Sequence, residues 1–169
     1  AEFRRLGRTS KMTATQPASS FSPLLATSNV KGRYSLHIHK TGADITLKHH
    51  LEGNSIVGSA GWGVAIHDAW VDLNKNVAWD VVGAAFVSEI GDEPGLWTNN
   101  VAIKGIGYMH PCLTKNFVND DHWRCGTGFA MSRHVIAQNN VCSGSASGEC
   151  FGWMTRRDPS VVIRIKKEN

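Results

Sequence analysis

Short segments in which apolar and polar residues alternate recur along this chain at roughly ten-residue intervals, and turn-forming residues separate them. Alternation with a period of two indicates a strand with one buried and one exposed face. A clear example is VVIRIKK, in which Val161, Ile163 and Ile165 share one face. Many short strands separated by turns are typical of a β-sandwich or barrel. The sequence therefore predicts an all-β fold, a single-domain antiparallel β-sandwich or barrel with one or two short helical turns and two disulfides.

The composition is that of an ordinary soluble domain. Of the 169 residues, 41% are hydrophobic and 19% are charged, so the chain is long enough and apolar enough to form one core. The longest uncharged apolar run is VVGAAFV at residues 81–87. A run of this length is far too short to cross a bilayer, and no membrane span is expected.

The chain divides into three parts by composition. Residues 1–12, AEFRRLGRTSKM, resemble a vector-derived or disordered leader and are set apart from the fold. Residues 13–30 are rich in Ser, Thr, Ala and Pro and are predicted to form a loose N-terminal arm. Residues 31–169 are predicted to be a single β-rich domain.

Most of the basic character belongs to the first of these parts. Its four basic residues and one acidic residue give +3, so the whole-chain charge of +4 leaves only +1 for residues 13–169. Nucleic-acid binding depends on clustered positive charge. The sequence therefore predicts no nucleic-acid partner.

Half of the eight histidines lie in residues 33–50. The alternating runs RYSLHIH and DITLKHH flank the short segment KTGA, in which Gly42 can take a positive φ. Pairing across KTGA matches apolar with apolar and polar with polar residues. This pattern predicts a β-hairpin with its turn at residues 40–43. A second hairpin is predicted in residues 69–82 around Asn74-Lys75-Asn76.

The first hairpin bears on metal binding. Pairing across it places His37 and His39 on the same polar face as Lys48, and an adjacent ammonium opposes binding of a divalent cation. The sequence thus predicts a solvated polar face with no metal and no cofactor. The alternative is a metal site. The spacing of His37, His39 and Asp44 resembles the first metal motif of the cupin barrels, in which two histidines on one strand and a nearby acid bind one metal, although no second cupin motif follows.

The chain has four cysteines, all in its last third: Cys112, Cys125, Cys142 and Cys150. An even number without a CxxC pair predicts two disulfides, and disulfides imply secretion. Three pairings are possible for four cysteines. The local pairing, 112 with 125 and 142 with 150, is favoured because it closes the flexible segment CSGSASGEC. The rival interpretation is a zinc site built from His110, Cys112, His122 and Cys125.

No established catalytic motif is present: the sequence contains no GxSxG, P-loop, HExxH or EF-hand pattern. A binding module is therefore favoured over an enzyme. The candidate recognition surface is the run of charged and aromatic residues between the first two cysteines: Asp120, Asp121, His122 and Trp123.

In size, paired cysteines, leader and strand pattern, the chain resembles small secreted fungal effector and elicitor proteins. That resemblance implies a secreted, extracellular, monomeric protein that is recognised by a host receptor or cell-surface component, triggers plant defence or cell death, and acts in virulence. The alternative function is a secreted cupin-like metal-binding protein or an enzyme acting on a polysaccharide.

Overall fold

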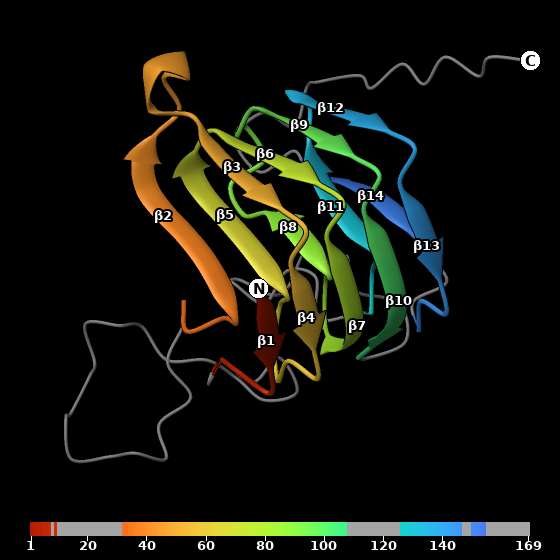
Figure 1. Ribbon diagram of the computed structural model, residues 1–169. Coiled ribbons are helices and arrows are strands. Elements are labelled where there is room, and N and C mark those ends of the chain that lie inside the picture. The colour runs from red at the N-terminus through yellow and green to blue at the C-terminus, as the bar shows by residue number, and fades with distance from the viewer. Residues whose placement is uncertain (8, 10–31, 108–125, 147–149, 155–169) are drawn as a thin grey trace, which may run out of the picture.

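The computed structural model describes residues 1–7, 9, 32–107, 126–146 and 150–154. Their regular secondary structure is almost entirely strand, and every strand pair in them is parallel (Figure 1). None of the helices in these ranges has the length and apolar character needed to cross a membrane.

The strands form three sheets. Sheet I contains, in spatial order, β1 (Glu2–Arg4), β4 (Ser55–Val57), β7 (Val77–Val82), β10 (Val101–Ile106) and β13 (Val141–Ser143). Sheet II contains β14 (Phe151–Met154), β11 (Phe129–Ser132), β8 (Phe86–Ser88), β5 (Val64–Ala69) and β2 (Leu36–Gly42). Sheet III contains β12 (Val135–Gln138), β9 (Gly95–Thr98), β6 (Val71–Asn74) and β3 (His49–Glu52).

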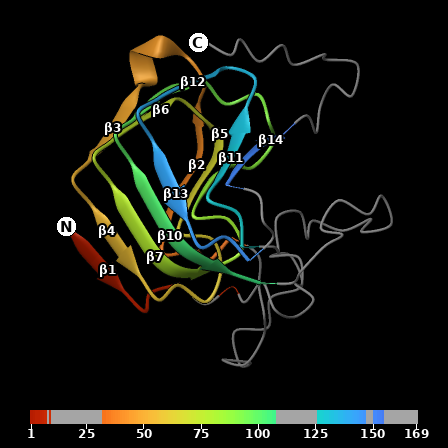
Figure 2. The same cartoon turned by 90° about the vertical axis from the view of Figure 1, so that its right-hand side faces the viewer.

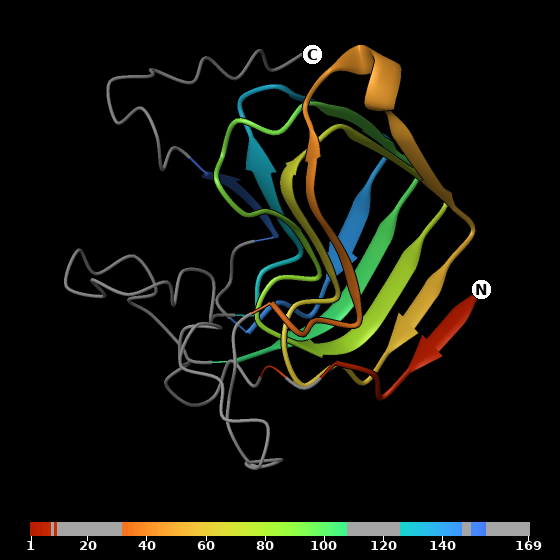
Figure 3. The same ribbon diagram turned by 90° about the vertical axis from the view of Figure 1, so that its left-hand side faces the viewer.

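The chain visits the three sheets in a fixed order, from sheet II to sheet III to sheet I and back. Each strand therefore pairs with the strand three places further along the chain, and the architecture is a parallel β-helix. Its successive coils are coil 1 (β2, β3, β4), coil 2 (β5, β6, β7), coil 3 (β8, β9, β10) and coil 4 (β11, β12, β13). Figures 2 and 3 show the sheets as the walls of this coil from two opposite sides.

The prediction of an antiparallel sandwich or barrel is wrong, and so is the predicted hairpin at residues 33–50. β2 and β3 belong to different sheets, where they pair in parallel with β5 and β6. A short 3₁₀ helix, η2 (Ile45–Leu47), lies between them, and its two apolar residues are exposed. Alternation of apolar and polar residues indicates that one face of a strand is buried. It carries no information about the direction of the partner strand.

The second predicted hairpin fails for the same reason. Its two strands exist as β6 and β7, but they lie in sheets III and I, and Asn74-Lys75-Asn76 forms the corner between them. The alternating segment at residues 161–165 lies outside the described residues.

The core fills the inside of the coil with columns of equivalent residues. Val64, Phe86 and Phe129 occupy register-matched positions in coils 2, 3 and 4. The rings of Phe86 and Phe129 stack with 5.0 Å between centroids, and those of Phe129 and Phe151 with 5.2 Å. Stacking along the axis follows from parallel register, because each residue sits directly above its counterpart in the preceding coil.

A ladder of asparagines marks the corner between sheets III and I: Asn54, Asn76, Asn100 and Asn140. The Oδ1 atom of each of the last three accepts both the backbone N–H and the side-chain amide of the asparagine in the preceding coil, at 2.9–3.0 Å. The ladder satisfies backbone groups at a corner where no strand partner is available.

The disulfide between Cys142 and Cys150 is confirmed, with 5.5 Å between the two Cα atoms. It is the only disulfide in the part of the chain described here, whereas the sequence predicted two disulfides for the whole chain. Cys112 and Cys125 lie outside the described residues, as does His110. Residues 2–4 of the segment set apart as a leader form β1, which pairs in parallel with β4.

Candidate metal centre

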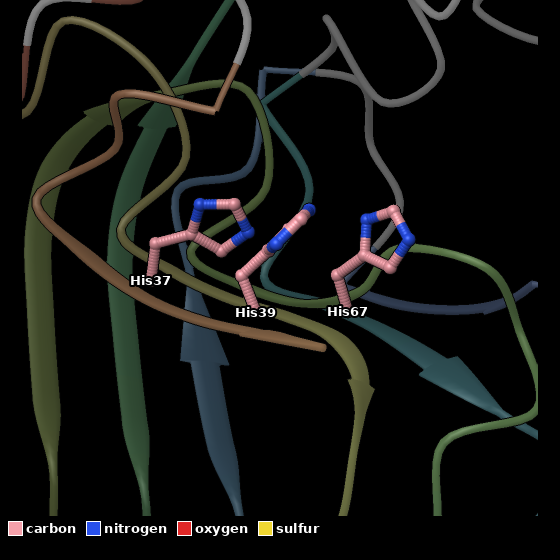
Figure 4. Close-up of side chains that lie close together, drawn as sticks. All are labelled: His37, His39 and His67. Carbon is pink, nitrogen blue, oxygen red and sulfur yellow. The ribbon is translucent and has the colours of Figure 1, made fainter. Parts of the chain in front are cut away.

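Three histidines gather on the outer face of sheet II: His37 and His39 from β2 and His67 from β5 (Figure 4). Leu36 and Ile38 pack against the core. Because side chains alternate along a strand, the two histidines of β2 point outward. The three side chains offer ligand atoms that all lie within 4.8 Å of one another.

Two of these histidines belong to a column that crosses three coils. His39 and His67 are register partners in β2 and β5. Glu89, directly after β8, occupies the next position, and its backbone N–H donates to the carbonyl of Ile66 at 2.7 Å. The Oε2 atom of Glu89 lies 3.2 Å from Nδ1 of His67. Coils 1, 2 and 3 thus each contribute one ionisable side chain at the same height on sheet II.

His37 reaches the same carboxylate from the neighbouring column. Its register partner is Ala65, a fully buried residue with a small side chain. The Nε2 atom of His37 lies 3.7 Å from Oε2 of Glu89. The carboxylate of Glu89 is therefore close to two imidazole rings that come from different strands.

The tautomer of His37 is fixed by its other nitrogen. Nδ1 lies 2.7 Å from the backbone carbonyl oxygen of Gly32. A carbonyl oxygen can only accept, so Nδ1 must carry the hydrogen and donate it. Burial lowers the pKa of His37 despite the opposing effects of this hydrogen bond and of Glu89. The neutral ring then presents an unprotonated Nε2, the form that binds a metal.

Two buried atoms at the centre of the cluster lack hydrogen bonds. Neither Nε2 of His37 nor Oε2 of Glu89 has a hydrogen-bond partner in the described structure. The nearby Nδ1 of His67 approaches Oε2 without the geometry of a hydrogen bond. A lone pair that faces a carboxylate oxygen is unfavourable, and buried polar atoms are rarely left without partners. A cation placed between the two atoms would satisfy both.

His39 completes the cluster at its exposed side. Its ring centroid lies 5.0 Å from that of His37 and 4.5 Å from that of His67. Partial burial, followed by the charges of His37 and His67, lowers its pKa. Both shifts favour the neutral imidazole at His37 and His39, and metal ligands must be deprotonated.

The features used for the prediction of a metal-free face are arranged differently in the structure. Lys48 does not share a face with His37 and His39, since its ammonium pairs with Asp72 of sheet III at 2.7 Å. Asp44, the acid of the alternative ligand set, instead caps η2, and its Oδ1 accepts both the N–H and the hydroxyl of Thr46. Those two hydrogen bonds lower the pKa of Asp44.

The sequence prediction did not place His67 or Glu89 beside His37 and His39. The alternation in GWGVAIHDAW places Ile66 inward and so predicts that His67 points outward, but only the register between coils brings it beside His39. The candidate recognition residues Asp120, Asp121, His122 and Trp123 lie outside the described residues.

Comparisons with protein-family models, with curated proteins and with solved structures found no match.

Proposed function

We propose that this chain binds a transition-metal ion at the cluster of His37, His39 and His67, and that chemistry at this ion is its function. The observation that carries the proposal is the pair of buried, unpartnered atoms, Nε2 of His37 and Oε2 of Glu89, that face each other across 3.7 Å. Imidazole is a preferred donor for Zn, Cu, Fe and Ni, whereas Mg and Ca prefer all-oxygen sites.

A simple ion pair accounts for the cluster less well. An ion pair between His37 and Glu89 requires a protonated ring, and burial acts against that form. The lowered pKa of His39 adds to the same preference for neutral rings. The neutral imidazoles of His37 and His39, together with the carboxylate of Glu89, form a donor set that is incomplete without a cation.

This proposal takes up the metal-protein alternative with a different ligand set and a different fold. The ligands come from parallel coils, and Asp44 has no part in them. A polysaccharide substrate remains a prediction. The same holds for secretion, for a monomeric state, and for action as an effector or elicitor through a host receptor or cell surface.

The test is a titration of metal-depleted protein with Zn²⁺, followed by gel filtration and elemental analysis. We expect about one equivalent of bound zinc. His37→Ala and His67→Ala should each abolish stoichiometric binding.

The matched control is His50→Ala. The side chain of His50 is 68% exposed, and it lies beside Asp72 on sheet III, away from the cluster. This variant should bind zinc like the wild type. Wild-type protein that retains no zinc, or equal loss in all three variants, would contradict the proposal.

A further inference from the structure

We infer that His37, His67 and Glu89 anchor the ion and that His39 is an exchangeable ligand, whose coordination position can accept a donor from outside the protein. The inference rests on the proposed function and extends it, because a centre with an exchangeable position is of the catalytic rather than the structural kind.

The donor atoms of His37, His67 and Glu89 are spaced as the ligands of one ion would be. With zinc–ligand bonds of 2.0–2.1 Å, two ligands of a tetrahedral ion lie about 3.4 Å apart. Oε2 of Glu89 lies 3.2 Å from Nδ1 of His67 and 3.7 Å from Nε2 of His37. The carboxylate oxygen thus lies close to each of the two ring nitrogens at the separation that a single ion requires, and the ligand atoms of the histidines lie within 4.8 Å of one another.

The anchoring side chains are also less exposed than His39. The side chains of His37 and Glu89 are each 13% exposed, and that of His67 is 21% exposed. His39 is exposed. The three anchoring side chains are therefore less exposed than His39, whose ring stands between those of His37 and His67 (Figure 4). An ion bound by the anchoring side chains would be open to solvent on the side of His39.

The rings of His37 and His39 also differ in how firmly they are held. Nδ1 of His37 is bonded to the carbonyl of Gly32, the kind of outer contact that orients a ligating histidine. No hydrogen bond holds the ring of His39 among the residues that the structure describes. His37 and His39 both lie on β2, the end strand of sheet II in the described part of the chain, so the hydrogen bond to Gly32 is the restraint that distinguishes the two rings. A ring with few restraints can leave the ion at little cost.

The donor set indicates what would replace His39. A divalent ion with neutral imidazoles and one carboxylate keeps a net charge of +1. Small anionic oxygen or nitrogen donors are therefore favoured at the free position.

The experiment uses the full chain loaded with Co²⁺, whose visible absorption reports coordination number and ligand exchange, and azide as the probe. His39→Ala should still bind one equivalent of Co²⁺, with an affinity reduced by about tenfold, comparable to the loss of a supporting contact. Azide should shift its spectrum at a lower concentration than it shifts that of the wild type.

Loss of an anchoring ligand should weaken Co²⁺ binding far more than loss of His39 does. Glu89→Gln keeps the shape of the side chain and removes its charge, and it should weaken Co²⁺ binding by more than about a hundredfold. His37→Ala should do the same, and His50→Ala should change neither affinity nor azide response. Far-UV circular dichroism of each metal-free variant verifies that the β-helix is intact.

The outcomes separate the two proposals. If wild-type protein binds no Co²⁺, the proposed function fails. If wild-type protein binds Co²⁺ but His39→Ala loses it as completely as His37→Ala does, the exchangeable role of His39 is wrong and the metal centre stands. If Glu89→Gln binds Co²⁺ with unchanged affinity, Glu89 is not an anchoring ligand, and the roles of the other ligands are unaffected.

Discussion

Glu93 is a buried carboxylate that holds the backbone beside two of the candidate ligands. Glu93 is only 1% exposed. It accepts four backbone N–H groups, those of Asp68, Ile90, Gly91 and Asp92, at 3.4, 2.8, 2.9 and 3.2 Å. The first two donors directly follow His67 and Glu89 in the chain. Glu93 therefore joins the backbone of coil 2 to that of coil 3 at the candidate centre.

Glu93→Gln should destabilise the protein by about 1–3 kcal/mol, because the amide group turns a donor towards N–H groups that need an acceptor. It should also weaken zinc binding by about 10–100-fold, since the backbone beside His67 and Glu89 loses its restraint. Urea unfolding and zinc titration measure the two effects.

The control for this change is Glu52→Gln. The side chain of Glu52 is 60% exposed and pairs with Lys75 at the surface, where such pairs contribute little. If Glu93→Gln and Glu52→Gln prove equally stable and equally good at binding zinc, Glu93 has no positioning role.

At the scale of single residues, the sequence supports only part of the candidate centre. The outward direction of His37 and His39 follows from the alternation within one strand. The proximity of His67 and Glu89 does not, because it depends on the register between coils. That register is set by the length of the corners, and these carry no periodic signal.

At the scale of elements, the asparagine ladder carries the corner between sheets III and I. Asn100 is completely buried. Its Oδ1 accepts from Asn76, and its amide donates to Asn140 and to the carbonyl of Leu73. Removal of this side chain would deprive two backbone groups of coil 2, the N–H of Asn76 and the carbonyl of Leu73, of these hydrogen bonds.

Asn100→Ala should therefore lower the free energy of unfolding by at least about 2 kcal/mol. Asn54→Ala, at the first position of the ladder, should cost less, because Asn54 is only partly buried and accepts from no other asparagine of the ladder. Urea denaturation of the two variants compares them. A smaller loss in Asn100→Ala than in Asn54→Ala would show that the ladder is not an important source of stability.

The strands themselves were largely predictable, whereas their pairing was not. β6 and β7 occupy the alternating runs on either side of Asn74-Lys75-Asn76, as expected. A short turn-like segment between two strands is compatible with a hairpin and also with the corner of a coil. The choice between them depends on contacts with the next coil, which lie beyond any local pattern.

At the scale of the whole molecule, the two histidines with lowered pKa values, His37 and His39, link stability to pH. Burial lowers the pKa values of His37 and His39 below the ordinary value of 6.5. Below pH 6.5 the unfolded chain therefore binds more protons than the native one, so the free energy of unfolding falls as the pH falls.

Metal-depleted protein should accordingly unfold at progressively lower temperature as the pH is reduced from about 7.5 to about 5, a range in which few carboxylates titrate. His37→Gln, which cannot titrate, should show a shallower dependence. Thermal unfolding at a series of pH values measures both proteins. Identical pH dependence in the two would mean that His37 makes no contribution to it.

The parallel coil has a mechanical consequence for the proposed ion. In a solenoid each coil contacts only its neighbours, so an end coil can open while the others remain folded. Within the described part of the chain, β2 of coil 1 has β5 as its sole partner in sheet II. An ion held by ligands from coils 1, 2 and 3 would cross-link these coils along the axis. The concentration of free metal would then set how often coil 1 unfolds locally and becomes accessible to proteases.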